Sequence, residues 1–143
     1  MKVLLRRAAE MGVRVHGVHL DDGGLGYYSP SEGRIYFDLS LTPDERRCTI
    51  AHELGHAHHG HTCDSLTAER QADTFAAELL IDPAEYAALE QVSTDRFYIA
   101  DELGITIDLL DHYRTHCLQR LGARTYSTRP LGRFTNTLAR ALS

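Results

Sequence analysis

The pentapeptide His52-Glu53-Leu54-Gly55-His56 places two imidazoles and a carboxylate at a spacing suited to metal chemistry. On a helix, residues four apart share a face, so His52 and His56 can bind one ion through their ring nitrogens. Zinc accepts neutral imidazole, and in catalytic sites it takes three protein ligands and leaves one position for water. Glu53 is then placed to remove a proton from that water as it attacks a carbonyl carbon. The pattern predicts metal-assisted hydrolysis.

A third ligand is expected from a second helix that follows the first. This helix carries Glu69, which lies thirteen residues after His56. Glu69 and Asp73 are four residues apart and share a helix face. We expect Glu69 to complete a site for one Zn²⁺ per chain. We expect Asp73 to accept the N–H of a ligand histidine and so to fix the tautomer of that ring. The rival ligands are Asp64, Asp73 itself and Glu78, which points away from Glu69 on an ideal helix.

Three more histidines, His58, His59 and His61, follow the metal-binding pattern closely. They fall at the expected end of the helix, where the helix dipole favours a protonated ring. A second metal site is the alternative interpretation of this cluster. Cys63 could also be a ligand, although a small buried side chain or a free thiol is the simpler interpretation.

Peptide hydrolysis also needs a group that stabilises the oxyanion or holds the substrate. The sequence offers several tyrosines and histidines for this role but does not rank them: Tyr27, Tyr28, His112, Tyr113 and His116. A hairpin near Tyr27 and Tyr28 could also pair with an extended peptide by strand addition.

Capping signals define the helices that must position these side chains. Thr42-Pro43-Asp44-Glu45 forms a capping box with proline in the first helical position, and Gly60 provides a stop. A second helix is expected to open near Ser65, and Asp82-Pro83 marks the start of the next. Further helices are expected over residues 1–11, 94–103 and 107–121, and strands over 13–20, 25–29 and 34–39.

Strands that precede helices indicate an α+β fold rather than an alternating α/β fold. We expect a small N-terminal β-sheet packed on the active-site helix, followed by a helical C-terminal half. The whole chain, residues 1–143, is predicted to be a single metallopeptidase domain. Its parts are a strand-rich segment, two active-site helices, a helical hairpin and a basic segment, at residues 12–40, 42–81, 94–121 and 122–143.

Composition and charge limit the cellular setting. A 143-residue chain with 43% hydrophobic residues is long enough for one buried core. No apolar run approaches the roughly 20 residues of a membrane span, and the N-terminus has no apolar signal segment. Three cysteines form no paired pattern, which favours a reducing compartment, the cytoplasm. All 20 acidic residues lie in 1–113, whereas 114–143 carries six arginines, which suits either an acidic partner or the chain's own acidic body.

The segment Ile99–Tyr113 has the spacing of a helix-turn-helix, with Gly104 at the turn. Its second helix would begin with Asp108 and Asp111, and contact with phosphates requires the opposite charge. We interpret the segment as a structural helical hairpin and do not expect direct nucleic-acid binding. The alternative function is a non-proteolytic zinc-binding regulatory or DNA-associated protein that uses residues 99–113.

The two metal-binding motifs together resemble the ImmA/IrrE family of metallo-endopeptidases. In that family, HExxH is followed by a segment similar to the one here, Glu69-Arg70-Gln71-Ala72-Asp73-Thr74-Phe75-Ala76-Ala77-Glu78-Leu79-Leu80-Ile81-Asp82-Pro83. The resemblance covers roughly residues 25–85 and implies a minimal, gluzincin-like zincin of phage or bacterial mobile-element origin. It implies zinc ligands at His52, His56 and Glu69 and a general base at Glu53. It also implies cleavage of a helix-turn-helix repressor. The short linker between the motifs, the histidine-rich helix end and the arginine-rich C-terminus depart from the family pattern.

Overall fold

The computed structural model describes the backbone of residues 1–121 and 124–127 and the side chains as far as Leu118. These residues form two units, one from Met1 to Ala76 and one from Ala77 onward. Helices and a small sheet occur together in the first unit, so the predicted α+β class is confirmed. The single-domain interpretation of residues 1–143 stays a prediction. Within the described residues, no helix is both long and apolar enough to cross a membrane.

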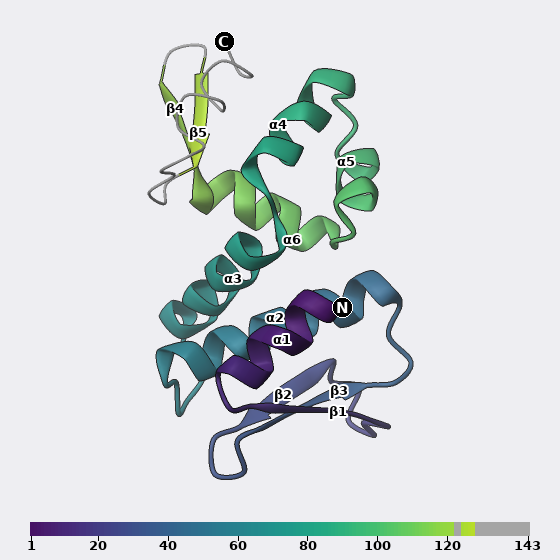
Figure 1. Cartoon of the computed structure of the whole chain (residues 1–143), viewed down its shortest axis with the longest axis vertical. Coiled ribbons are helices and arrows are strands. Elements are labelled where there is room, and N and C mark those ends of the chain that lie inside the picture. The colour runs from purple at the N-terminus through teal and green to yellow at the C-terminus, as the bar shows by residue number, and fades with distance from the viewer. Residues whose placement is uncertain (122–123, 128–143) are drawn as a thin grey trace. The chain divides into compact units, whose positions relative to one another are not determined.

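The first unit contains a three-stranded sheet covered on one face by helices (Figure 1). The strands β1 (Arg14–Val18), β2 (Gly26–Ser29) and β3 (Arg34–Asp38) have the order β1-β3-β2. The predicted hairpin is confirmed, because β2 and β3 are antiparallel, while β1 runs parallel to β3. Helices α1 (Lys2–Glu10) and α2 (Pro43–His59) cover the sheet.

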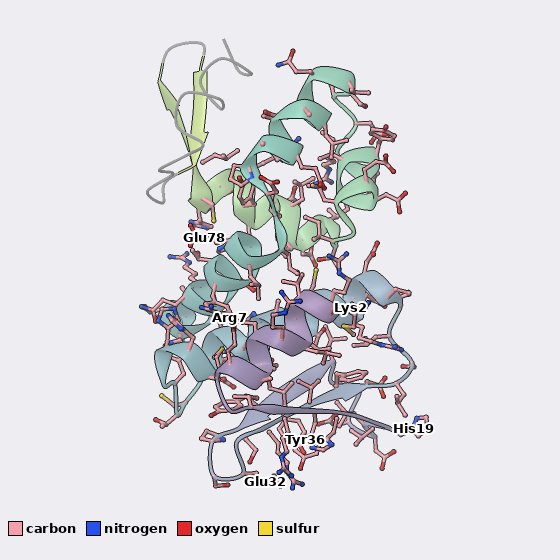
Figure 2. The ribbon with its side chains drawn as sticks, viewed as in Figure 1. Lys2, Arg7, His19, Glu32, Tyr36 and Glu78 are labelled. Atoms are coloured by element: carbon pink, nitrogen blue, oxygen red, sulfur yellow. The ribbon has the colours of Figure 1, made fainter. Side chains whose placement is uncertain are left out.

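The two faces of the sheet differ in character. Ile35 of β3 is fully buried beneath the helices, whereas Tyr36 lies on the opposite face beside Glu32, as Figure 2 shows. The Tyr36 hydroxyl donates to Glu32 at 2.9 Å, and its ring stacks on those of His16 and Tyr27 at 5.6 and 5.0 Å between centroids. Because side chains alternate along a strand, Tyr28 of β2 points to the helix-covered face.

Helix α2 begins and ends where its sequence predicts. The Thr42 side chain accepts from the Glu45 N–H, and the Glu45 carboxylate accepts from the Thr42 N–H, which completes the capping box. At the other end, Gly60 adopts the left-handed conformation with φ 69°, which only glycine adopts without strain. The chain turns back there, and the N–H of His61 donates to the carbonyl of His56 at 3.0 Å.

Helix α3 (Leu66–Leu80) packs closely on α2 within the first unit. The Ser65 hydroxyl accepts from the Ala68 N–H, as a helix start near Ser65 requires. A Cβ placed on Gly55 of α2 would lie 2.7 Å from the Cα and 2.8 Å from the carbonyl oxygen of Ala72. The two helix backbones are therefore in contact at Gly55, and no larger residue fits there without a shift of α3.

The second unit is mainly helical. Beyond the end of α3 it contains α4 (Pro83–Val92), α5 (Arg96–Leu103) and α6 (Ile107–His112), each capped at its start by the side chain of Asp82, Asp95 or Thr106. Gly104 ends α5 in the left-handed conformation, with φ 70°. The starts of these helices and the end of α5 lie within two residues of the positions predicted from the sequence.

The predicted extension of the last helix to Leu121 is wrong. The helix closes in a single π-helical turn (η1, Tyr113–Cys117), and Leu118 is already extended, with φ −106° and ψ 146°. Strand β4 (Leu118–Leu121) then pairs antiparallel with β5 (Arg124–Ser127), so strand hydrogen bonds replace those of a helix. The rest of the predicted basic segment, 122–123 and 128–143, lies outside the described residues.

Tyr86 and Tyr113 are fully buried in the second unit and lie edge to face, with ring centroids 5.1 Å apart. The Tyr86 hydroxyl donates to Glu90 at 2.7 Å and accepts from Arg114 Nε at 2.9 Å. Burial, together with the adjacent Glu90 carboxylate, raises the pKa of Tyr86 above its ordinary value. Both rings are therefore part of the core of this unit.

We predict that Gly55→Ala destabilises the protein. Helix propensity alone would favour alanine by about 1 kcal/mol. Overpacking against the backbone of Ala72, however, costs about 1–3 kcal/mol, so the net effect should be a loss. Thermal unfolding followed by circular dichroism measures it, and a melting temperature above that of the wild type would contradict the close packing.

Candidate metal centre

Three electron-pair donors from two helices converge at one point in the first unit. His52 and His56 come from α2, and Glu69 comes from the first turn of α3. The Nε2 atoms of the two histidines are 3.1 Å apart, and the Glu69 carboxylate oxygens lie 3.4 Å from that of His52 and 2.6 Å from that of His56. Within the described residues, this is the group of three ligand side chains that could hold one metal ion.

The donor set has the chemistry and the size for zinc. Donor atoms 2.0–2.1 Å from a common tetrahedral centre lie roughly 3.3 Å from one another, close to two of the three separations observed. The third contact is shorter, and Glu69 Oε2 is buried there without a hydrogen-bond donor. Such a buried acceptor is stabilised by a cation. The residues therefore fit a zinc ion.

Asp73 occupies the position predicted for a residue that orients a ligand ring. Its carboxylate lies 2.7 Å from Nδ1 of His52, on the side of the ring away from Glu69. Nδ1 of His52 is thus the protonated nitrogen, which leaves the Nε2 lone pair for a metal. Burial opposes the charged form of His52, but the hydrogen bond to Asp73 and the carboxylates of Glu53 and Glu69 raise its pKa above the ordinary value.

The other ligand ring, His56, has a second histidine on its far side. Its Nδ1 lies 3.0 Å from Nδ1 of His61, and Nε2 of His61 lies 2.7 Å from Oε1 of Gln71. Burial, followed by the nearby charge of His52, holds the pKa of His56 below its ordinary value. The neutral form, which binds metals, is therefore favoured. The sequence pattern did not identify Gln71 or this contact of His61.

Glu53 is buried beside the donors, with 9% of its surface exposed. Burial is the main cause that raises its pKa to about 7. The negative charge of Glu69 acts in the same direction, while His52 and the backbone N–H of Tyr28 act against it. A cation bound by the three ligands would lower this pKa. Without a cation Glu53 therefore keeps its proton up to about neutral pH, and a bound cation would favour the carboxylate form that a general base requires.

A cleft of about 340 Å³ opens over this group in the first unit. It is lined by Glu53, His56 and Glu69, by residues of β2 and by the loop after α2, the further lining residues being Gly26, Tyr27, Tyr28, Pro30, His61, Thr62, Cys63 and Asp64. The predicted substrate residues Tyr27 and Tyr28 thus line the same cleft as Glu53, His56 and Glu69. Asp64, a predicted rival ligand, lies at the cleft wall.

The remaining candidates are placed as follows. His112 and Tyr113 belong to the second unit, where Tyr113 is buried, and their role at the oxyanion stays a prediction. His58 lies against the ring of Phe75, and His59 stacks on His61. No second group of three ligands forms in the part of the chain that the structure describes.

An HExxH helix packed on a small sheet, with a carboxylate supplied by the next helix, is the arrangement of a zincin-type metallopeptidase. The family model of the IrrE N-terminal-like domain, Peptidase_M78, matches residues 8–113. The chain belongs to this peptidase family, and the predicted ImmA/IrrE membership is confirmed.

Among solved structures, a Mycobacterium tuberculosis transcriptional regulator has a similar fold, with a TM-score of 0.61 and 22% sequence identity. The similarity covers 85% of this chain but only 43% of the regulator, so this chain spans less than half of its length. None of the curated proteins matches this chain.

We predict that Glu53→Gln stabilises the metal-free protein at about pH 8 but not at about pH 4. The pKa of Glu53 in the folded state, about 7, lies above its ordinary value of 4.5. The folded protein therefore retains a proton that the unfolded chain loses, and stability falls as pH rises between these values. Glutamine removes this penalty, which is on the order of 3 kcal/mol. Thermal melts in the presence of a chelator measure the effect, and equal gains at both pH values would contradict the buried charge.

Proposed function

We propose that this chain is a zinc-dependent endopeptidase in which His52, His56 and Glu69 hold one Zn²⁺. The observation that carries the proposal is the convergence of two Nε2 atoms and one carboxylate beside Glu53 at the edge of an open cleft. Zinc bound there would supply a Lewis acid that polarises the peptide carbonyl and makes a bound water acidic near neutral pH. A site with three protein ligands leaves a position for that water, whereas structural zinc sites close all four.

Glu53 is the general base in this proposal. Its carboxylate accepts the proton that the attacking water loses and can deliver it to the amine nitrogen that leaves. The N–H of Tyr28 helps to hold the ionised carboxylate in place. Asp73 keeps His52 in the tautomer that binds the metal. We assign the oxyanion to Tyr28 rather than Tyr27, because Tyr28 lies on the helix-covered face of β2.

The substrate is proposed to be a helix-turn-helix transcriptional repressor, bound in an extended form at the cleft. The support is the family to which the chain belongs and the position of β2 at the edge of the sheet order β1-β3-β2. An edge strand presents unpaired backbone groups to which an extended peptide can add as a further strand. The proposed setting is the cytoplasm of a bacterium that carries a phage or mobile element.

Charge disfavours the alternative of a non-proteolytic DNA-associated protein. Asp108 is exposed in the first turn of α6, and Asp111 pairs with Arg96 at 2.7 Å. A recognition helix that begins with acidic residues would repel phosphates. We therefore retain the structural interpretation of residues 99–113.

We predict that Glu53→Gln abolishes cleavage while zinc remains bound, and that Glu69→Ala loses zinc. The zinc-loaded chain would be incubated with the purified helix-turn-helix repressor encoded beside its gene, and products identified by mass spectrometry. The wild type should cut the repressor only with zinc present. Loss of one general base lowers hydrolysis by about 10²–10⁴-fold. Zinc content is measured in parallel by atomic absorption.

Glu102→Gln is the matched control, because Glu102 is an exposed glutamate on α5. It should cleave like the wild type. A Glu53→Gln variant that retains full cleavage would contradict the assignment of the base. A repressor left intact by the zinc-loaded wild type at equimolar concentration would contradict the substrate class, and a wild type that binds no zinc would contradict the site itself.

A further inference from the structure

The end of helix α2 folds His61 back onto the ligand ring of His56. Gly60 reverses the chain, and the His61 N–H donates to the carbonyl of His56, so the backbone of His61 is fixed relative to that residue. The two rings meet edge to face, with centroids 5.2 Å apart. His61 is therefore held on the Nδ1 side of the His56 ring, away from the proposed metal.

The hydrogen bonds of His61 have one direction that is compatible with metal binding. The side-chain oxygen of Gln71, on α3, lies 2.7 Å from Nε2 of His61 and can only accept, so Nε2 carries the proton. A neutral His61 then has a lone pair on Nδ1, 3.0 Å from Nδ1 of His56. His56 must donate its Nδ1–H to that lone pair. The Nε2 of His56 is left unprotonated and faces Glu69.

We propose that His61 and Gln71 are positioning residues that fix His56 in its metal-binding tautomer. This inference rests on the proposed zinc site and extends it. His61 and Gln71 would orient His56 as Asp73 orients His52, but the two arrangements differ in charge. Asp73 is a carboxylate, whereas the groups behind His56 are an imidazole and an amide, so His56 is oriented without further negative charge beside Glu53 and Glu69.

His61 is not proposed as a fourth ligand. Both of its ring nitrogens already have partners, on His56 and on Gln71, and it is not part of the group of converging donors. A structural role for the ring, or a role as a ligand, makes different predictions from a tautomer relay, because only the relay requires an acceptor at the position of Nδ1.

The test measures zinc affinity of the full-length protein by competition with a chromophoric chelator. His61→Leu keeps a side chain of similar bulk but removes the acceptor, and it should weaken zinc binding about 10–100-fold, as loss of an orienting hydrogen bond does elsewhere. His61→Asn places an amide oxygen near the position of Nδ1 and should restore most of the affinity. Gln71→Met should weaken binding and Gln71→Glu, which can only accept, should preserve it.

Thr67→Val is the matched control, since Thr67 is exposed on α3 one helical turn before Gln71 and should leave zinc affinity unchanged. A second readout is independent of the metal. Nitrogen-15 NMR of the metal-free wild type at about pH 9, where histidine is neutral, should show His56 protonated at Nδ1. Gln71→Met should shift it toward the Nε2–H form.

Wild-type zinc affinity that survives in His61→Leu would overturn the relay while leaving the proposed peptidase site intact. Equal losses in His61→Leu and His61→Asn would also overturn it, because the ring would then act as a ligand or as packing. A wild type that binds no zinc but shows the Nδ1–H tautomer of His56 would contradict the proposed function and leave the hydrogen-bond relay in place.

Discussion

The constraint on which the site depends is the enforced proximity of three atoms that each carry a lone pair. The Nε2 atoms of His52 and His56 and the carboxylate of Glu69 repel one another unless a cation or a proton lies between them. The fold maintains this arrangement because α2 and α3 touch at the backbone, at Gly55. Packing elsewhere in the first unit must therefore offset this unfavourable electrostatic term. A bound cation would remove the repulsion, so metal binding would stabilise the folded protein.

Glu53 adds to this electrostatic repulsion, because it is a third carboxylate near the two rings, besides Glu69 and Asp73. Its position on α2 between the ligand histidines is dictated by helical spacing, and α2 is packed against β2 and β3. The sheet, the base and the ligands are thus linked through one helix. The hydrogen bonds behind each ligand ring then decide which nitrogen of that ring remains available.

Local signals in the sequence predicted the parts of this arrangement that depend on local geometry. The capping box at Thr42, the stop at Gly60 and the cap at Asp82 determined the helix limits, and helical spacing brought Glu69 and Asp73 to the ligands. Long-range features were not predictable in this way. The parallel pairing of β1 with β3 depends on how the sheet closes, and the last helix stops at Cys117 because the following residues find strand partners. The contact of His61 with Gln71 depends on the reversal at Gly60 and on helix packing, neither of which spacing alone reveals.

X-ray absorption at the zinc edge of the full-length protein tests the central claim most directly. The account predicts one zinc per chain with nitrogen and oxygen neighbours only, at about 2.0–2.1 Å, and the multiple-scattering pattern of two imidazoles. A sulfur neighbour at about 2.3 Å, contributed by Cys63 at the cleft wall, or a shell with a single imidazole, would contradict it.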